Sequence, residues 1–96
     1  MIDFKSLVEV ESVKDIISFL AGSEKGIDYR SLDRLFVRYR FDVIEKGELL
    51  STVKEMGASG VIQQGEHPMI YIKGPNWKEP AFVAEKKYFK VVKLGR

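Results

Sequence analysis

The spacing of apolar residues changes once along the chain, at the glycine-bearing stretch GASG at positions 57–60. Before this stretch, apolar residues recur every three or four positions, which is the period of a helix buried on one side. After it, two short β-favouring runs, at 61–64 and 69–73, are joined by the turn-forming stretch GEHP. This order predicts an α/β domain of the α+β type, with three helices followed by a β-hairpin.

The first clearly delimited helix begins after Ser12, which precedes Asp15 by three positions, so that each side chain can accept a hydrogen bond from a free N–H of the first turn. Gly22 stands where a left-handed cap commonly ends a helix. The preceding stretch IDFKSLVEV is either a short helix or an irregular segment that packs Phe4 and Leu7. The apolar face of the helix consists of Val13, Ile16, Ile17 and Leu20.

The next segment carries two patterns at once. Asp28 or Ser31 can cap a helix there. The apolar face of that helix would be Leu32, Leu35, Phe36 and Tyr39. From position 35 onward, however, LFVRYRFDV alternates apolar and polar residues, as a strand does. We expect helix to about Tyr39 and keep strand as the alternative for residues 35–43.

A third helix is expected to start at Asp42 and Glu45, a second acidic pair at capping spacing, although Gly47 weakens its first turn. GASG ends this helix. Its apolar face consists of Leu49, Leu50, Val53 and Met56. Beyond the hairpin, YFKVVKL has β character, which predicts a C-terminal strand with one side formed by Tyr88, Lys90, Val92 and Leu94.

The composition is that of a soluble globular protein with a modest core. Ninety-six residues, of which 45% are hydrophobic and 31% charged, predict one domain spanning 1–96. No apolar run approaches the roughly 18–20 residues that span a bilayer, and the first residues lack the pattern of a signal peptide. Without cysteine there is no disulfide, thiol nucleophile or thiolate ligand. We therefore expect a cytoplasmic protein that does not contact membranes.

Catalytic chemistry has few candidate residues here. His67 is the single histidine, and no second histidine or cysteine exists to complete a metal set with it. The glycine-bearing stretches AGSEKG and GASG lack the spacings that cradle phosphates. We therefore interpret His67 as a polar turn residue. We expect no enzyme activity, no cofactor and no bound metal, and a small-molecule ligand is disfavoured.

Charge is distributed unevenly, although the net charge is only +2. Residues 29–41 carry four arginines against one aspartate, and Arg30, Arg34 and Arg38 recur at helical spacing, which predicts a basic stripe. With Arg40 and the aromatic residues between them, these side chains can contact phosphates or stack on bases. They equally suit an acidic protein partner, or a solvated face whose long stems cover apolar surface.

The segment ELLSTVKEMGASGVIQQGEHPMIYIKG resembles the third helix and wing of winged helix-turn-helix domains. Residues at matching places are Leu49, Leu50 and Val53 for the helix core, Gly57 near the helix end, Val61 and Ile62 for the first wing strand, and Ile70 and Ile72 for the second. The resemblance covers residues 12–74. It departs from the family at the small strand that usually follows the first helix, for which only GID at 26–28 is available.

The resemblance implies that the third helix would enter the major groove if the domain read DNA. The polar residues of that helix are Lys46, Glu48, Ser51, Thr52, Lys54 and Glu55. Residues 42–72 carry five acidic side chains against two lysines, and that charge opposes attraction to a polyanion. Nucleic acid is therefore a disfavoured partner. It remains the alternative, through the Arg30–Arg40 stripe and the lysine-rich end.

The only tryptophan, Trp77, lies in KGPNWKEPAF, between two of the three prolines. It is either a lid on the protein's own core or an anchor for a partner, because tryptophan buries much area and is common at binding hot spots. The longer stretch GPNWKEPAFVAEKKY is similar to the tails of small immunity proteins encoded beside bacterial toxins.

That similarity implies a non-enzymatic inhibitor of the immunity or antitoxin type, which masks the active site of a bacterial toxin. A nuclease-type toxin with a basic cleft would face an acidic surface, and charge complementarity speeds such association. The candidate contacts are Glu45, Glu48, Glu55 and Glu66. A nucleic-acid-binding regulator is the runner-up, and a subunit of a larger complex is the third option.

Overall fold

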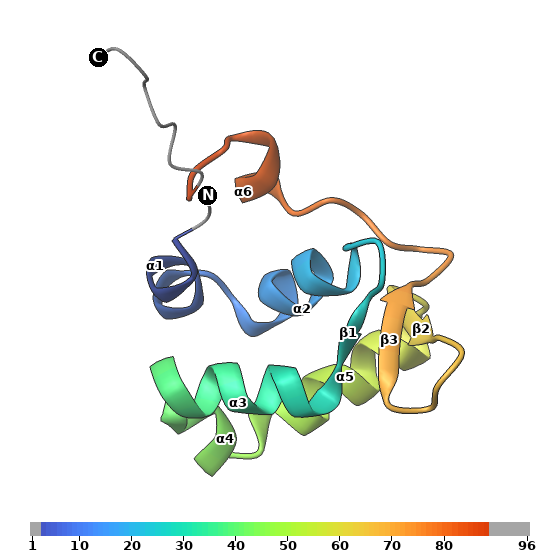
Figure 1. Cartoon of the computed structure of the whole chain (residues 1–96), viewed down its shortest axis with the longest axis horizontal. Helices are drawn as coiled ribbons and strands as arrows, with labels where there is room; N and C mark the ends of the chain where they lie inside the picture. Colours follow the sequence, from blue (N-terminus) through green and yellow to red (C-terminus); the bar gives the residue numbers. More distant parts are fainter. Residues whose placement is uncertain (1–2, 89–96) are drawn as a thin grey trace.

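The computed structural model describes residues 3–88. In this part of the chain the protein is a small mixed α+β domain with six helices and a three-stranded antiparallel sheet, which confirms the α+β expectation (Figure 1). In chain order, the elements are α1 Phe4–Val10, α2 Val13–Ala21, β1 Ile27–Asp28, α3 Tyr29–Tyr39, α4 Phe41–Glu45, α5 Glu48–Ser59, β2 Ile62–Gln64, β3 Ile70–Lys73 and α6 Ala81–Ala84. None of these described helices is long and apolar enough to cross a membrane.

The first two helices begin at side-chain caps. The Asp3 carboxylate accepts hydrogen bonds from the backbone N–H and the hydroxyl of Ser6, at 3.2 and 2.8 Å, and so starts α1. The Ser12 hydroxyl accepts from the N–H of Asp15 at 3.1 Å and starts α2 where the sequence predicts it. The segment before α2 is therefore a helix, and it buries Leu7.

Gly22 ends α2, but the predicted left-handed cap is wrong. Its φ is −76°, which any residue can adopt. The glycine is required for a different reason, because a Cβ at this position would lie 2.6 Å from Cζ2 of Trp77. Position 22 is therefore small so that an indole ring can pack against the end of α2.

Helix α3 ends at Tyr39, as expected, and the strand alternative for residues 35–43 is wrong. Arg40, with φ −149° and ψ 69°, interrupts the helix, and α4 then starts at Phe41. The alternating apolar residues do not share one buried face, since Val37 and Phe41 are exposed whereas Val43 is buried. Helical burial of one side of α3 prevailed over the local β pattern.

The single third helix predicted from Asp42 onward is in fact two. Lys46 and Gly47 separate α4 from α5, and Gly47 has a φ of +71°, in the left-handed region that glycine favours. Helix α5 then runs through most of GASG and ends only at Gly60, whose φ is +81°. Leu50 is 49% exposed, so it does not belong to the buried face predicted for it.

The sheet has the order β1-β3-β2, with both pairings antiparallel. Strand β1, from the stretch GID, pairs its Ile27 with Tyr71 of β3. Strands β2 and β3 form the predicted hairpin, with Gln63 opposite Ile72. The two residues of β1 form a strand because they pair with the edge of β3. A sequence pattern of only two residues cannot indicate that pairing. The sheet lies at one end of the helices (Figure 1).

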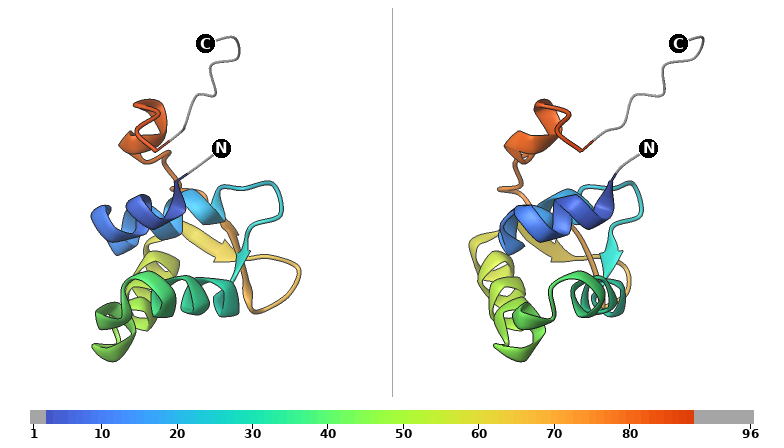
Figure 2. Two further views of the ribbon diagram at one scale, coloured as in Figure 1. Left: turned by 60° about the vertical axis from the view of Figure 1, so that its left-hand side comes forward. Right: turned by 90° about the vertical axis from the view of Figure 1, so that its left-hand side faces the viewer.

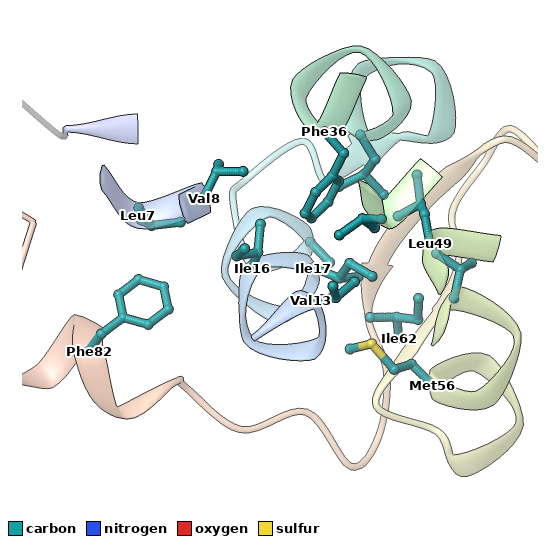
Figure 3. Close-up of a cluster of buried hydrophobic side chains, with 14 of the residues drawn as sticks. Leu7, Val8, Val13, Ile16, Ile17, Phe36, Leu49, Met56, Ile62 and Phe82 are labelled. Carbon is teal, nitrogen blue, oxygen red and sulfur yellow. The ribbon is translucent and has the colours of Figure 1, made fainter. Parts of the chain in front are cut away.

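The helices form tiers around one continuous core. In both views of Figure 2, α1 and α2 lie between α6 on one side and α3, α4 and α5 on the other. Figure 3 shows side chains from all of these tiers converging. The buried apolar residues are Leu7, Val8, Val13, Ile16, Ile17, Ala21, Leu32, Phe36, Val43, Leu49, Val53, Met56, Ile62, Phe82 and Tyr88.

The last described residues close over the first helix. The ring of Phe82 packs edge-to-face on Phe19 and on Tyr88, with centroids 5.4 and 5.6 Å apart. The Tyr88 hydroxyl donates to the carboxylate of Glu11, and its carbonyl accepts from the N–H of Asp3 at 2.9 Å. The strand predicted for 88–94 lies outside the described residues, apart from Tyr88.

Candidate functional site

The four candidate glutamates do not form a single cluster. Glu45 ends α4 and Glu48 begins α5, so these two lie at the adjoining ends of consecutive helices. Glu55 follows Glu48 by seven residues, which returns it to the same side of α5 two turns later. Glu66 lies on the loop between β2 and β3, away from both helices in the chain. All four are exposed. We call Glu45, Glu48 and Glu55 the acidic surface.

The exposed side of α5 determines what that helix can bind. Its core-facing residues are Leu49, Val53 and Met56, and the opposite side presents mainly Ser51, Lys54, Glu55 and Ala58. No arginine is present on α5, and together α4 and α5 carry four carboxylates against one lysine, with Lys46 between the two helices. Such a helix pair repels the phosphates of a nucleic acid and attracts a basic protein surface.

The basic stripe consists of three arginines rather than four. Arg30, Arg34 and Arg38 are exposed on the side of α3 opposite its buried residues, as their spacing predicts. Arg40 has a different role: its guanidinium donates to the carbonyls of Val8 and Glu11 at 3.2 and 2.8 Å. These carbonyls lie at the end of α1, so Arg40 caps that helix and joins it to the end of α3.

Trp77 contacts its own domain at the end of α2. Its indole N–H donates to the Ser18 carbonyl at 2.8 Å, and its ring lies against Gly22. The Lys73 ammonium lies 4.4 Å from the ring centroid, at cation–π distance. The side chain is only partly buried. Trp77 thus packs on the end of α2 and also presents part of its ring at the surface.

Two apolar hollows adjoin these features. The first, of about 410 Å³, is formed by Trp77 together with Phe4, Phe19, Leu20, Gly22, Ser23, Lys73, Glu79, Pro80 and Val83. The second, of about 280 Å³, is lined by Phe4, Ser31, Arg34, Leu35, Arg38 and Tyr39. Phe4 lines both, so the Trp77 hollow and the basic stripe meet at one aromatic side chain that is 40% exposed.

Sequence reasoning does not identify Phe4 as part of a surface site. Phe4 precedes Leu7 and Val8 by three and four residues, which is the spacing of a core residue. Those two are fully buried, whereas Phe4 lies in the first turn, where the neighbouring elements do not cover it completely. Its exposure depends on where α3 and residues 74–80, which we call the Trp77 segment, pass, and neither position can be read from the local sequence.

His67 lies in an exposed turn, where its Nδ1 accepts a long hydrogen bond of 3.5 Å from the N–H of Met69. It borders a hollow of about 470 Å³ that also includes Lys25, Asp28 and Arg30. The Asp28 carboxylate bonds to Ser31, which lowers its pKa. In residues 3–88 no three His, Cys, Asp or Glu side chains come together in a way that could hold a metal ion.

Glu11, Lys87 and Tyr88 form a cluster of titratable groups, which we call the Glu11 cluster. The Tyr88 hydroxyl donates to the Glu11 carboxylate and holds its pKa below 4.5, and the Lys87 ammonium, 3.0 Å away, acts in the same direction. Burial and the same carboxylate raise the pKa of Tyr88. This cluster ties the residues that follow α6 to the end of α1, and it lies at no hollow described above, so we interpret it as structural.

Comparison with known proteins identifies no relative: no family model, no curated protein and no solved structure matches the chain. The charged surfaces and the two hollows are therefore the basis for assigning a function.

Proposed function

We propose that the chain is a non-enzymatic protein-binding domain with a winged-helix arrangement. The order α2, β1, α3, α5, β2, β3 and the sheet order β1-β3-β2 support this arrangement, with α1, α4 and α6 as additions. The short strand β1, at Ile27–Asp28, lies between α2 and α3, which supports the proposal because the family usually has a small strand after its first helix. In this arrangement α5 is the helix that would enter a DNA groove, and the β2–β3 hairpin is the wing.

The observation that carries the protein-binding proposal is the charge on α5. A helix that reads bases needs Arg, Lys, Asn or Gln on its outer side, and phosphate attraction supplies most non-specific affinity. Here the outer side offers Lys54 as its one cation, with Glu48 and Glu55 beside it. The exposed apolar side chain of Leu50 on the same helix also suits a protein surface better than a groove of DNA.

We further propose that the partner is a bacterial toxin of the nuclease type and that this chain inhibits it in the cytoplasm. A nuclease cleft must attract phosphates and is therefore basic, so the acidic surface complements it. Glu45, Glu48 and Glu55 are exposed and free to pair with lysines or arginines of such a cleft. Glu66, on the wing loop, would reach the partner only if the wing also contacts it.

The test uses the protein encoded beside this chain in its genome, purified and titrated in both wild-type and variant form. The triple variant Glu45→Gln, Glu48→Gln, Glu55→Gln should slow association at low salt by about tenfold or more, because close opposite charges steer encounter. The matched control, Glu9→Gln, Glu24→Gln, Glu85→Gln, removes three exposed carboxylates elsewhere and should change association less than twofold. Equal effects of the two variants, or no complex at all, would refute the proposal.

A nucleic-acid-binding regulator is the second candidate, supported by the alignment of Arg30, Arg34 and Arg38 on α3. Binding through this stripe would be weak, non-specific and steeply salt-dependent, since phosphates would supply all of it. An electrophoretic mobility shift that persists at high salt and depends on sequence would favour the regulator over the inhibitor.

A further inference from the structure

The Trp77 hollow has the character of a side-chain pocket. Its volume of about 410 Å³ lies within the range of small-ligand sites, about 300–1,000 Å³. Aromatic and aliphatic side chains form most of its wall, and Gly22 allows the Trp77 ring to pack closely against the end of α2 there. One large apolar side chain of a partner, inserted here, would lose its contact with water and pack on Phe4 and Trp77.

The second hollow adds charge to this apolar site. Arg34 and Arg38 border it, and Arg38 lies over the ring of Tyr39, 5.3 Å from the centroid. Within residues 3–88 the one ion pair joins Lys87 to Glu11, so neither Arg34 nor Arg38 is part of an ion pair there. Their guanidinium groups are therefore available for carboxylates of a partner.

Phe4 connects the two hollows, so one bound segment can occupy both. Lys73 at the first hollow adds a third cation, against the single carboxylate of Glu79. The surface thus combines an apolar pocket with a predominantly cationic border. A segment that suits it has one large apolar side chain and acidic residues a few positions away.

We propose that the surface around Phe4 docks an acidic segment of a partner protein, with a large apolar side chain of that segment in the Trp77 hollow and its carboxylates on Arg34 and Arg38. This surface consists of α1, α3 and the Trp77 segment, whereas the proposed toxin-binding surface lies on α4 and α5. The inference therefore stands independently of the proposed function.

Two other occupants fit less well. Residues 89–96 of the chain itself carry three cationic side chains and no acidic one, so they do not complement the arginines. A nucleic acid would satisfy Arg34 and Arg38 but would leave the apolar Trp77 hollow without a matching group, apart from a base stacked on an aromatic ring. Binding of a nucleic acid with a base stacked in the hollow is one of the outcomes that the experiment below distinguishes.

The probe is a short synthetic peptide with one Phe-Leu pair flanked on both sides by Asp and Glu. Because Trp77 is the only tryptophan of the chain and the peptide has none, a change in tryptophan emission reports binding at the hollow. We expect saturable binding by the full chain with a dissociation constant below about 1 mM. Two control peptides, one with Lys in place of the acids and one with Ala-Ala in place of Phe-Leu, should bind at least about tenfold more weakly.

The decisive variant is Arg34→Glu, Arg38→Glu, which reverses both charges of exposed side chains and should weaken the acidic peptide by about tenfold or more. Its matched control, Lys14→Glu, Lys54→Glu, makes the same change of net charge on α2 and α5 and should weaken it less than threefold. Calorimetric titration provides a second readout. The proposal is wrong if the acidic peptide does not bind, if the Ala-Ala peptide binds equally, if both double variants behave alike, or if oligouridylate binds in the peptide's place.

Discussion

Replacing Trp77 with alanine should remove the contacts between this side chain and the end of α2. The indole donates to the Ser18 carbonyl, its ring packs on Gly22, and Lys73 lies over its face. The Ser18 carbonyl also accepts from the N–H of Gly22, so it keeps a partner after the substitution. The loss therefore comes from burial and from one hydrogen bond, without an orphaned acceptor.

The magnitude follows from the partial burial of the side chain. A tryptophan buries about 150–250 Å² when fully covered. About two thirds of that area, the least that the partial burial of Trp77 implies, corresponds to roughly 2.5–4 kcal/mol at about 25 cal/mol/Å². The hydrogen bond contributes about 1 kcal/mol more. We expect Trp77→Ala to lower the free energy of unfolding by about 4 kcal/mol, and Trp77→Phe, which keeps a ring but no donor, by about half as much.

The assay is urea unfolding followed by far-ultraviolet circular dichroism, because the variants lack the tryptophan that would otherwise report unfolding. A loss below about 1 kcal/mol for Trp77→Ala would refute the lid interpretation. In that case the contacts on α2 contribute little in solution, and the ring is kept for a partner instead.

A second substitution tests the packing directly. Gly22→Ala places a Cβ 2.6 Å from Cζ2 of Trp77, so in the wild type it should displace the ring and cost about 1–3 kcal/mol. With Trp77→Ala the obstacle is gone, and because the φ of position 22 is −76° the added methyl group should stabilise by about 0.5–1 kcal/mol. The sign should thus reverse between the two backgrounds. Additive effects would show that ring and glycine do not contact each other in solution.

Three further predictions concern Gly57, Arg40 and Glu11. Gly57→Ala should stabilise by about 0.5–1 kcal/mol in urea unfolding, because a Cβ there meets no atom within 4 Å and glycine weakens a helix interior; destabilisation would mean that α5 is not helical at that point. Arg40→Ala should cost about 2 kcal/mol, since it removes two charged hydrogen bonds to the end of α1, whereas Arg34→Ala should change stability by less than about 0.5 kcal/mol. Glu11 has a pKa lowered from 4.5 by Tyr88, so its contribution is complete above pH 4.5 and is lost as the pH falls through its lower folded value. Acid titration of Glu11→Gln should lack that part of the pH dependence, and an unchanged acid profile would contradict the assignment.

The sequence was most informative where structure depends on neighbouring residues. The Ser12 cap and the apolar face of α2 are local features, and both lie where the spacing predicts them. The β2–β3 hairpin likewise follows from two short apolar runs and a turn. The alternation at 35–43 is also a local pattern, but it misled because the burial of Phe36 depends on the whole fold.

The roles that could not be predicted depend on contacts between residues far apart in the chain. Arg40 bonds to carbonyls about thirty positions earlier in the chain. Its neighbours in the sequence do not indicate those bonds, and they suggest instead that Arg40 belongs with the exposed arginines. Gly22 is explained by Trp77, which follows it by more than fifty residues. Phe4 becomes part of a surface site only where two such distant segments pass beside it.

The hydrogen bonds between the first and last described elements determine when this fold can be completed during synthesis. Helix α1 is made first, yet Asp3 and Glu11 bond to Tyr88, which is added more than seventy residues later. At about 5–20 residues per second, α1 waits several seconds for that partner and can meanwhile pack only on α2 and α3. A nascent chain halted before α6 would therefore leave Phe19 and the end of α1 uncovered, in a state that chaperones and proteases can recognise until the final helix emerges.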